Sequence, residues 1–510
     1  MQKKYILAHD VGTGGTKAVL TDLNGRIVRT AYRPHNLLYP KEGWVEQDPE
    51  ELWKAFIEAT IDVQSKENIE SNEILGLGVS AQMFNLLPVD ENCNPLTKMI
   101  SWLDSRSVKQ ADRLMRDDMP HFLFQNTGNI PTAKDIIPKI LWLKEECPEI
   151  WKRTFKLLDC KEYIIHRLTG KIAIDWHGAS VYFLFDPYKK KWSEPVCMRL
   201  GIPLNKLPHP FPSTHIIGGL TDRASKLMGL TAGTPVVLCA GDVAVAQTGS
   251  GSNKDGKAHL CIGTATWIGI SSNKLINNPE KPFWALNHIS PNKWIIAGEM
   301  ETGGGALMWF KNAFCQDEVK SARRQGISTY EIIGKMAADI EPGANKLLFA
   351  PWLSGERAPV LDHYARGAFI GLSISHNKSH LARAVMEGVA YQLRWIIESM
   401  ENIGHTIHEI NAIGGGSTSE IWTRIISDVT GWPLNIMEYP LEAGALGAAL
   451  TTAVALRKYS SVESIDELIQ VNSVIKPRKE NKNRYDDLYE EFREIYTVLE
   501  PVFRKLYKTR

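Results

Sequence analysis

The chain has 510 residues, which is enough for at least two domains that each bury a full hydrophobic core. Hydrophobic residues make up 44% of the sequence and charged residues 23%, as in an ordinary soluble globular protein. The formal net charge of +1 excludes a general attraction to nucleic acid or to an anionic membrane, so neither is expected as a partner.

The cysteines and the N-terminus are typical of a cytoplasmic protein. The seven cysteines are scattered and form no C-x-x-C pair, so we expect neither a disulfide framework nor a zinc site. The first predicted strand begins almost at the N-terminus and leaves no room for a signal peptide. No uncharged apolar run is long enough to span a bilayer. We therefore predict a location in the reducing cytoplasm.

Residues 5–22 predict a strand, a tight glycine-rich turn and a second strand. Gly14 lets the turn approach an anion, while Thr13 adds a hydroxyl donor and Lys17 a cation. Asp10, at the end of the first strand, could hold a hydrated magnesium ion. A P-loop would need a glycine directly before Lys17, and a dinucleotide fingerprint would need a glycine in its place. We interpret the turn as a phosphate cradle, and the alternative is an ordinary glycine-rich hairpin.

A further predicted strand, over residues 74–80, is followed by Gln82, Met83 and Phe84. Open α/β sheets bind their ligands where strands end, so these side chains are candidates for a substrate pocket.

A third candidate group combines an aromatic ring, a carboxylate and a guanidinium within five residues. Its members are Trp102, Asp104 and Arg106. Two interpretations remain open for the charged pair, namely a structural ion pair at a helix start and a direct contact with a sugar.

The middle of the chain predicts a buried strand that ends in a carboxylate, and then a domain boundary. The strand covers residues 235–241 and is followed by Asp242. A run of small residues at 249–253 is the best boundary in the chain. Residues 259–270 then repeat the pattern of strand, Gly-Thr turn and strand, with Gly263 and Thr264 in the turn. Two such hairpins half a chain apart suggest two related domains that face one cleft.

Two later glycine-rich turns each join a strand to a helix. They lie at residues 301–305 and 411–417, and each could let a base or ribose rest against the backbone, or could be only a flexible loop. The tail from residue 485 to residue 507 has the apolar spacing of a long amphipathic helix, for which packing is the expected role. We therefore divide the chain into domains at 1–248 and 249–460, followed by a C-terminal amphipathic helix within 461–510.

One motif makes a family resemblance specific. Residues 367–372, a spacer of seven residues, and residues 380–387 resemble the C-terminal signature of the FGGY carbohydrate kinases. Residues 44–49 and 353–359 are similar to the xylulokinase branch of that family, as are Trp102 with its two charged neighbours and the turn at 414–417. The resemblance covers residues 1 to about 455. The N-terminal signature is only partly met, because Lys134 and Ile136 occupy positions usually filled by other residue types.

The resemblance implies an α/β fold of two actin-like, ribonuclease H-like ATPase domains that flank an ATP cleft, and ATP-dependent phosphorylation of a sugar hydroxyl. Asp242 matches the catalytic aspartate of the family, and it would share a magnesium ion with Asp10. The implied ATP-binding residues are Thr13, Gly14, Lys17, Gly263, Thr264, Gly304, Gly414, Gly415, Gly416, Ser417 and Ser419. The implied sugar-binding residues are Gln82, Met83, Phe84, Trp102, Asp104, Arg106 and Asp242.

Two departures from the xylulokinase pattern affect the expected substrate. Phe84 stands in place of a histidine, and Val243 in place of an asparagine. D-xylulose remains the first expectation, and the alternatives are another ketopentose, a polyol, an aldonate such as gluconate, or the autoinducer-2 precursor. Different classes of protein are a non-catalytic ATP switch and a sugar-sensing regulator. Because dimers are common in the family, a homodimer is one expected state.

Overall fold

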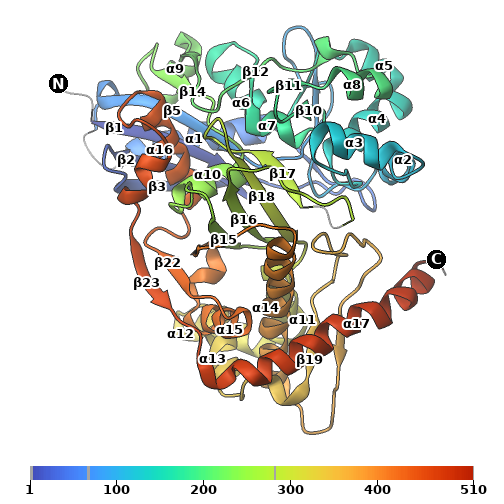
Figure 1. Cartoon of the computed structure of the whole chain (residues 1–510). Coiled ribbons are helices and arrows are strands. Elements are labelled where there is room, and N and C mark those ends of the chain that lie inside the picture. The colour runs from blue at the N-terminus through green and yellow to red at the C-terminus, as the bar shows by residue number, and fades with distance from the viewer. Residues whose placement is uncertain (1–3, 66–68, 281–282, 509–510) are drawn as a thin grey trace.

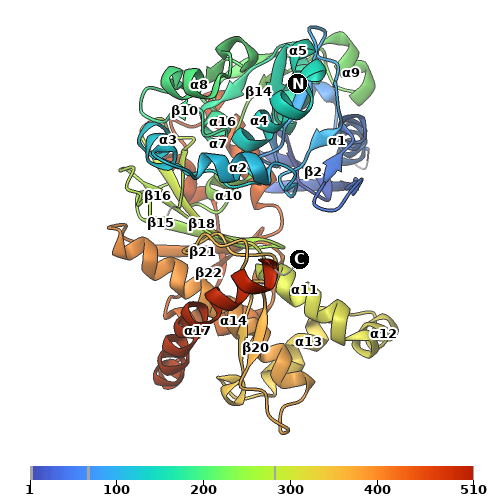
Figure 2. The same ribbon diagram turned by 90° about the vertical axis from the view of Figure 1, so that its right-hand side faces the viewer.

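The computed structural model describes residues 4–65, 69–280 and 283–508, which form two lobes that lie one above the other in Figure 1 and Figure 2. Each lobe is built around one large mixed β-sheet. We call them the first lobe, which contains the N-terminal strands, and the second lobe, which contains the sheet in the middle of both views.

The sheet of the first lobe has six strands in the order β13-β14-β5-β1-β2-β3. Their bounds are β1 (Tyr5–Val11), β2 (Gly15–Asp22), β3 (Ile27–Pro34), β5 (Ile74–Ala81), β13 (Ile216–Gly219) and β14 (Pro235–Val237). β1, β2 and β3 pair antiparallel, whereas β1, β5 and β14 pair parallel. β1 and β5 are almost fully buried because helices cover both faces of the sheet, which explains their continuous apolar sequences.

One face of this sheet is covered by α1 (Pro49–Gln64) and α6 (Cys160–Thr169). Asp48 caps α1 by accepting a hydrogen bond from the backbone N–H of Glu50, with Pro49 at the first helical position. The remaining helices of the first lobe are α2 (Val108–Leu114), α3 (Met119–Thr127), α4 (Ile136–Glu146), α5 (Pro148–Arg153), α7 (Trp176–Val181), α8 (Glu194–Leu200) and α9 (Asp222–Met228). Its short strands are β4 (Glu46–Gln47), β6 (Leu87–Val89), β7 (Met99–Ile100), β8 (Lys156–Leu158), β9 (Ile174–Asp175), β10 (Phe185–Asp186), β11 (Lys191–Trp192) and β12 (Pro210–Phe211).

The sheet of the second lobe has seven strands in the order β17-β18-β16-β15-β21-β22-β23. Their bounds are β15 (Lys257–Ile262), β16 (Thr266–Ser272), β17 (Trp284–Asn287), β18 (Trp294–Met300), β21 (Glu409–Ile413), β22 (Leu434–Met437) and β23 (Val471–Ile475). β15, β16 and β18 pair antiparallel, and β15, β21 and β22 pair parallel. In both sheets an antiparallel hairpin pairs in parallel with the strands that follow, which agrees with the two related domains suggested by the repeated hairpin pattern.

The helices of the second lobe carry its core on both faces of the sheet. They are α11 (Gly303–Phe314), α12 (Gln316–Gln325), α13 (Thr329–Ala338), α14 (Lys378–Asn402), α15 (Glu420–Thr430) and α17 (Lys482–Lys508), and a small antiparallel pair joins β19 (Leu348–Ala350) to β20 (Ala368–Ile370). The buried helix α14 contains the second part of the family-like signature.

Two helices cross between the sheets and connect the lobes. They are α10 (Asp242–Gly249), which follows the first sheet, and α16 (Ala443–Ala455), which returns from the second half of the chain and lies against β1 and β5. A Cβ atom at Gly249 would lie 1.8 Å from the carbonyl oxygen of Ala443, and one at Gly447 would lie 1.8 Å from that of Val245. The backbones therefore touch at these glycines, which allow α10 and α16 to pack closely.

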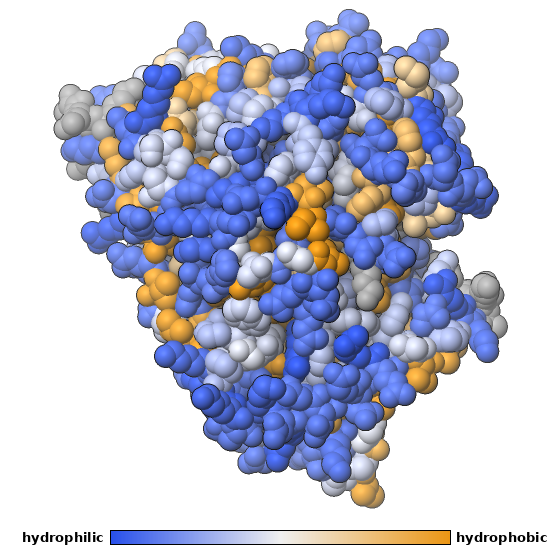
Figure 3. Space-filling view, in the orientation of Figure 1, coloured by the Kyte–Doolittle hydropathy of each residue, from blue (hydrophilic) through white to orange (hydrophobic). Residues whose placement is uncertain are grey.

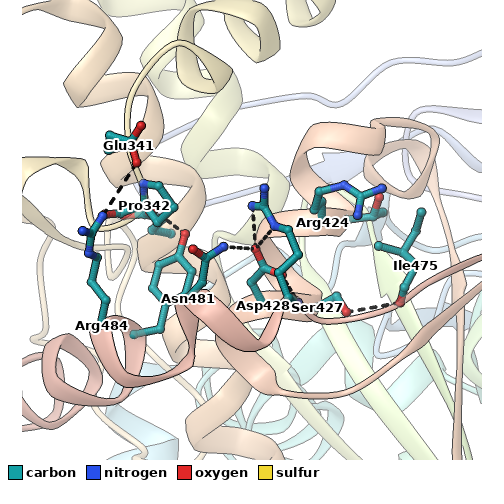
Figure 4. A network of polar contacts seen from close by, with 12 residues as sticks. Glu341, Pro342, Arg424, Ser427, Asp428, Ile475, Asn481 and Arg484 are labelled. Atoms are coloured by element: carbon teal, nitrogen blue, oxygen red, sulfur yellow. Dashed lines mark hydrogen bonds and ion pairs between the residues drawn. The ribbon is translucent and has the colours of Figure 1, made fainter.

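The C-terminal tail differs in part from the expected helix. β23 adds to the edge of the second sheet before α17 begins at Lys482. Figure 4 shows the junction, where Asp428 at the end of α15 accepts hydrogen bonds from Arg478 and Asn481. The pattern of apolar residues located the helix but not the short strand, which is defined by its pairing with β22.

Hydrophilic residues dominate the face of the molecule in Figure 3, with hydrophobic residues gathered near its middle. Within the part of the chain that the structure describes, no helix is both long and apolar enough to cross a membrane.

Candidate active site

Two carboxylates lie close together where the first sheet meets α10. Asp10 is near the end of β1, and Asp242 is the first residue of α10. Burial and the negative charge of Asp10 raise the pKa of Asp242 to about 8, although its Oδ1 accepts a hydrogen bond of 2.9 Å from the N–H of Val243. Burial also raises the pKa of Asp10, opposed by the positive charge of Lys17. The two side chains therefore share a site with an excess of negative charge.

This site fits a hydrated magnesium ion. The buried Oδ1 of Asp10 has no hydrogen-bond partner among the described residues, and carboxylate oxygens are ligands that Mg²⁺ prefers. No group of three or more His, Cys, Asp and Glu side chains in the described ranges could enclose a metal ion. A magnesium ion here would therefore keep much of its water and rely on the two carboxylates, as magnesium commonly does.

The turn of the first hairpin is held by a chain of polar contacts. Thr13 Oγ1 accepts a hydrogen bond of 2.8 Å from the indole N–H of Trp102, and its carbonyl oxygen accepts one of 2.9 Å from Gln47. Gln82 in turn donates to Gln47 over 2.6 Å. Tyr32 donates to the carbonyl oxygen of Gly14. Of the residues predicted for the sugar pocket, Trp102 thus contacts the predicted phosphate turn directly, and Gln82 is connected to it through Gln47. Gln47 lies in the family-like motif at 44–49 but was not predicted as a site residue.

Lys17 links this hairpin to the second half of the chain. Its ammonium group donates a hydrogen bond to the carbonyl oxygen of Leu441 and lies 3.8 Å from a carboxylate oxygen of Glu442. Both residues directly precede α16, whose residue Gly444 lies against Asp10, since a Cβ there would be 2.4 Å from Asp10 Oδ2. Lys17 is therefore next to the predicted metal ligand, as a phosphate-binding cation would need to be.

Met83 and Phe84 occupy different surroundings. The Met83 sulfur packs against Gly241, directly before Asp242, and lies 3.2 Å from Nε2 of His177. The Phe84 ring is buried against Phe183, with centroids 5.9 Å apart, and against Trp284 of the second lobe, 4.8 Å away. Phe84 therefore contributes to an aromatic contact between the lobes. The sequence offered no signal for His177, which is a lone buried histidine brought to the site by α7.

Asp104 and Arg106 bind each other rather than pointing freely into a cavity. Asp104 is fully buried and accepts hydrogen bonds from the Arg106 guanidinium, at 2.8–3.0 Å, and from the backbone N–H of Val45, at 2.6 Å. Arg106 also contacts Glu46 over 2.8 Å and lies over the ring of Trp44. Of the two interpretations left open, these contacts favour the structural ion pair.

The second hairpin touches the start of α11 through backbone groups. The N–H of Gly304 donates to the carbonyl oxygen of Gly263 over 2.9 Å, and that of Gly305 donates to Thr264 over 2.8 Å. A Cβ atom at Gly304 would lie 2.1 Å from the Gly263 oxygen, so a larger residue cannot make this contact. The glycines predicted for nucleotide binding thus allow the helix to approach the hairpin.

A cavity of about 870 Å³ opens beside this hairpin. The predicted nucleotide residues that line it are Gly263, Thr264, Gly304, Gly415, Gly416 and Ser419. Gly414 and Ser417 lie in the adjoining turn, where the Ser417 hydroxyl donates to the Gly414 carbonyl over 2.7 Å. Thr13, Gly14 and Lys17 do not line the cavity, but Leu441, which Lys17 contacts, does.

The opposite wall of the cavity comes from helices that the sequence analysis did not assign to the site. α13 contributes Tyr330, Glu331, Gly334 and Lys335, and α15 contributes its first turn. The four positions on α13 share one helix face, while Ile333 and Ala337 on another face are buried in the core. The uncommitted face of this amphipathic helix was the signal in the sequence that could have identified α13 as part of the cavity wall.

The family follows from two matches that together cover most of the chain. The N-terminal domain of the FGGY family of carbohydrate kinases matches residues 5–249, and the C-terminal domain matches residues 258–456. The chain belongs to this family of kinases. It is 30% identical to the xylulose kinase of Bacillus subtilis over 496 residues, or 97% of each chain, and 30% identical to the gluconokinase of that species over 506 residues, or 98% of this chain and 97% of the relative.

The fold of this FGGY kinase is similar to the crystal structure of gluconate kinase from Lactobacillus acidophilus. The TM-score is 0.90 at 26% sequence identity, and the match covers 99% of each chain. The two-domain α/β fold and the family expected from the signature motif are therefore confirmed. Relatives of both names are equally similar, so they do not distinguish between a ketose and an aldonate as substrate.

The lobes of this FGGY kinase are also joined by buried charges. Arg357 of the second lobe lies 3.2 Å from Asp135 of the first lobe, and 3.3 Å and 3.4 Å from Glu299 and Glu301. Lys134 donates to Glu301 over 2.6 Å. Lys134 is one of the two departures from the N-terminal signature, and its ammonium bridges the lobes. Glu299 adds to the raised pKa of Asp242, after burial and Asp10, so the cluster is near the carboxylates.

Proposed function

We propose that the protein transfers the γ-phosphoryl group of ATP to a hydroxyl group of a neutral sugar, with Mg²⁺ as cofactor and D-xylulose as the first candidate. The observation that carries this proposal is the position of Asp242. It begins the helix that crosses between the lobes, beside Asp10 and Met83 and near the second hairpin, whose Cys261 has a pKa raised by burial and by the charges of Asp242 and Asp10.

Asp242 would act as the base. A pKa of about 8 makes its carboxylate a stronger proton acceptor than an ordinary aspartate at neutral pH. The sugar oxygen forms a bond to the γ-phosphorus while the bond from that phosphorus to the ADP oxygen breaks, and the hydroxyl proton passes to Asp242. When bound, Mg²⁺ would supply neutralisation of phosphate charge. Asp10 and Asp242 would hold it, while Lys17 and Thr264 would hold phosphate oxygens.

The adenosine part of ATP would occupy the cavity of about 870 Å³. The apolar part of its lining, which includes Leu307, Ile421 and Trp422, suits a planar base. The hairpin turn with Gly263 and Thr264 lies at one side of this cavity, and Leu441 connects its rim to Lys17. The phosphates would therefore extend from the cavity toward the two carboxylates.

The charges beside the carboxylates favour a neutral sugar over an aldonate. Arg357 and Lys134 are both paired with carboxylates, and Lys139 donates to the carbonyl oxygens of Phe84 and Lys134. Among the described residues of this cluster, each of these three cations is thus already occupied. The carboxylate of gluconate would be repelled by Asp10 and Asp242. Phe84 and Val243 make the pocket less polar than the xylulokinase pattern, so another neutral ketopentose or a polyol is the next candidate.

A coupled assay of ADP release tests these proposals with D-xylulose, other pentuloses, xylitol, gluconate and the autoinducer-2 precursor. We expect release to depend on a neutral acceptor, and gluconate to have a kcat/KM at least about tenfold lower. Gluconate as the best substrate would overturn the neutral-sugar proposal. ADP release that no acceptor stimulates would instead support a non-catalytic ATP switch.

A further inference from the structure

The two helices that line the far side of the nucleotide cavity are held at their other ends by one short segment. This segment covers residues 478–485, and we call it the C-terminal clamp. It lies beyond residue 456, where the match to the FGGY C-terminal domain ends. α15 lines the cavity with its first turn, and α13 lines it with the face that contains Tyr330 and Gly334.

The clamp holds α15 through Asp428, whose side chain is completely buried near the end of that helix. Arg478 donates three hydrogen bonds to this carboxylate, from its backbone N–H over 2.8 Å, from Nε over 2.9 Å and from Nη2 over 2.7 Å. Asn481 adds a fourth of 2.9 Å. Figure 4 shows these contacts converging on Asp428. Charge-assisted hydrogen bonds of this kind are among the stronger polar contacts in proteins.

The clamp holds α13 through a buried triad of Arg383, Glu387 and Tyr485. The last carbonyl groups of a helix have no partner within the helix. Here Arg383 Nη1 donates to the carbonyl oxygens of Ala337, over 3.1 Å, and Ile340, over 2.7 Å. Arg383 is oriented by Glu387, at 2.8 Å from Nε, and by the Tyr485 hydroxyl, at 2.9 Å from Nη2.

Tyr485 completes this triad from α17. Its hydroxyl accepts a hydrogen bond from Arg383 and donates one of 2.8 Å to Glu387 Oε1. The same oxygen accepts the N–H of Gly343, so the loop after α13 is fixed as well. On the outside of that loop, Arg484 donates to the carbonyl oxygen of Pro342 over 2.9 Å (Figure 4). Both Arg383 and Glu387 belong to the family-like signature, which does not itself line the carboxylate site.

We propose that the C-terminal clamp positions the nucleotide wall, so that Tyr485 and Arg484 act as positioning residues for ATP binding. This inference rests on the proposed function, which places the adenosine in the cavity beside α13. Without the clamp, the end of α13 would move more freely, and ATP would have to order it on binding. Asp242 belongs to α10, at the other lobe, so the chemical step should be affected less than nucleotide affinity.

The chain provides a matched control in Tyr489, one turn further along α17. Its ring is as buried as that of Tyr485, and its hydroxyl donates to Glu398 of α14 over 2.7 Å. Tyr485→Phe and Tyr489→Phe therefore each remove one hydroxyl that joins α17 to α14. Only Tyr485 belongs to the triad that reaches α13.

The experiment measures the Kd of ATP by calorimetry, the KM of ATP and of the sugar, kcat, and hydrogen exchange of peptides covering residues 329–343. For Tyr485→Phe we expect the Kd and KM of ATP to rise about fivefold, with kcat and the sugar KM within twofold. Exchange in 329–343 should become faster. Tyr489→Phe should leave ATP affinity and this exchange unchanged. Arg484→Ala, a change at a half-exposed side chain, should give a smaller shift in the same direction.

Two results separate the possible failures. If the wild type binds ATP and Tyr485→Phe matches Tyr489→Phe in ATP affinity and in exchange, the clamp only supports packing and the inference is wrong. Unchanged values for Arg484→Ala would support the same conclusion even if Tyr485→Phe did not fold. If the wild type does not bind ATP, the proposed function fails instead, and the exchange of α13 alone decides whether the clamp holds that helix.

Discussion

The two hairpins of the molecule have the same place in their sheets but different surroundings. The first, between β1 and β2, lies beside Asp10 and is held by polar side chains, including Trp102 and Gln47. The second, between β15 and β16, lies beside a large cavity and is contacted by the backbone of α11. The two sheets therefore have similar strand orders, but the first hairpin lies beside a pair of carboxylates and the second lies beside a cavity. The difference suggests that the first lobe performs the chemistry and the second lobe binds the nucleotide.

Two buried cations, Arg383 in the second lobe and Lys139 in the first, differ in whether a carboxylate pairs with them directly. Arg383 of the second lobe forms an ion pair with Glu387 at 2.8 Å. Lys139 of the first lobe is fully buried and donates to two carbonyl oxygens, those of Phe84 at 2.7 Å and Lys134 at 2.5 Å. The first arrangement balances charge, whereas the second leaves a cation whose state depends on pH.

The largest expected effect comes from Asp242→Asn, which keeps the shape of the side chain but removes the proton acceptor. Sugar-dependent turnover should fall by about 100-fold or more, because a general base contributes roughly 10²–10⁴-fold. ATP affinity, measured by calorimetry, should change little because the cavity belongs to the other lobe. Near-normal turnover would remove Asp242 from the mechanism, and a large loss of ATP affinity would break the division of labour between the lobes.

Asp10→Ala should have the next largest effect, on the magnesium dependence. If Asp10 holds a hydrated ion, its loss should raise the magnesium concentration for half-maximal activity by about 10- to 100-fold, the range seen when groups supporting a metal are removed. A titration of initial rate against magnesium at saturating ATP and sugar measures this shift. An unchanged titration would reduce the first hairpin to a structural element.

Lys17→Ala tests whether the cation of the first hairpin contributes to ATP binding at the cavity beside the second hairpin. Its ammonium reaches Leu441 on the rim of the cavity, so its loss should raise the KM of ATP by about tenfold, the effect of one charge-assisted contact. The KM of the sugar should stay within twofold. Lys98→Ala, which removes a surface cation paired with Asp48, is the control. A rise in the KM of the sugar alone would show that Lys17 contributes to sugar binding and would contradict its assignment to ATP.

Local sequence patterns were sufficient to predict the hairpins and the glycine turns. Each depends on neighbours within about ten residues, such as Gly304, whose lack of a side chain permits its backbone contact. The roles of these residues in binding stay predictions. The strand predicted over residues 235–241 is only partly formed, since β14 ends at Val237 and Cys239 has a left-handed backbone (φ 48°) before α10 begins at Asp242. The repeated hairpin, also a local pattern, indicated two related domains, but the strand order of each sheet comes only from the structure.

Features that depend on distant packing could not be predicted in this way. Arg357 meets Asp135 across 222 positions in the chain, and α13 is placed beside the cavity by its packing against α14, α12 and α15. Asp104 shows the same limit. The sequence left its role open because the decisive partner, the N–H of Val45, is 59 positions away. A pattern can identify a charged pair, but only the fold shows whether that pair is already satisfied.

The smallest expected effect, on stability rather than turnover, tests the contrast between the buried cations. Burial lowers the pKa of Lys139 to about 7, opposed by the negative charges of Asp104, Asp135 and Asp159. In the unfolded chain the same group titrates near the ordinary lysine value of about 10.4. Between these values the unfolded state binds more protons than the folded state, so the contribution of Lys139 to the free energy of unfolding rises with pH. Below pH 7 both states are protonated and that contribution is constant.

Lys139→Met removes this titration while keeping a side chain of similar length. We therefore expect the free energy of unfolding of the wild type, minus that of Lys139→Met, to increase between pH 7 and pH 9 by at most about 1.4 kcal/mol per pH unit. Urea denaturation of both proteins at pH 6, 7.5 and 9 measures the difference, in which the titrating groups that do not interact with Lys139 cancel. Arg383 should show no such slope because an arginine stays protonated throughout this range. A difference that is constant or falls with pH would mean that Lys139 keeps its proton in the folded state, and the contrast between the lobes would then lie in their cavities and carboxylates alone.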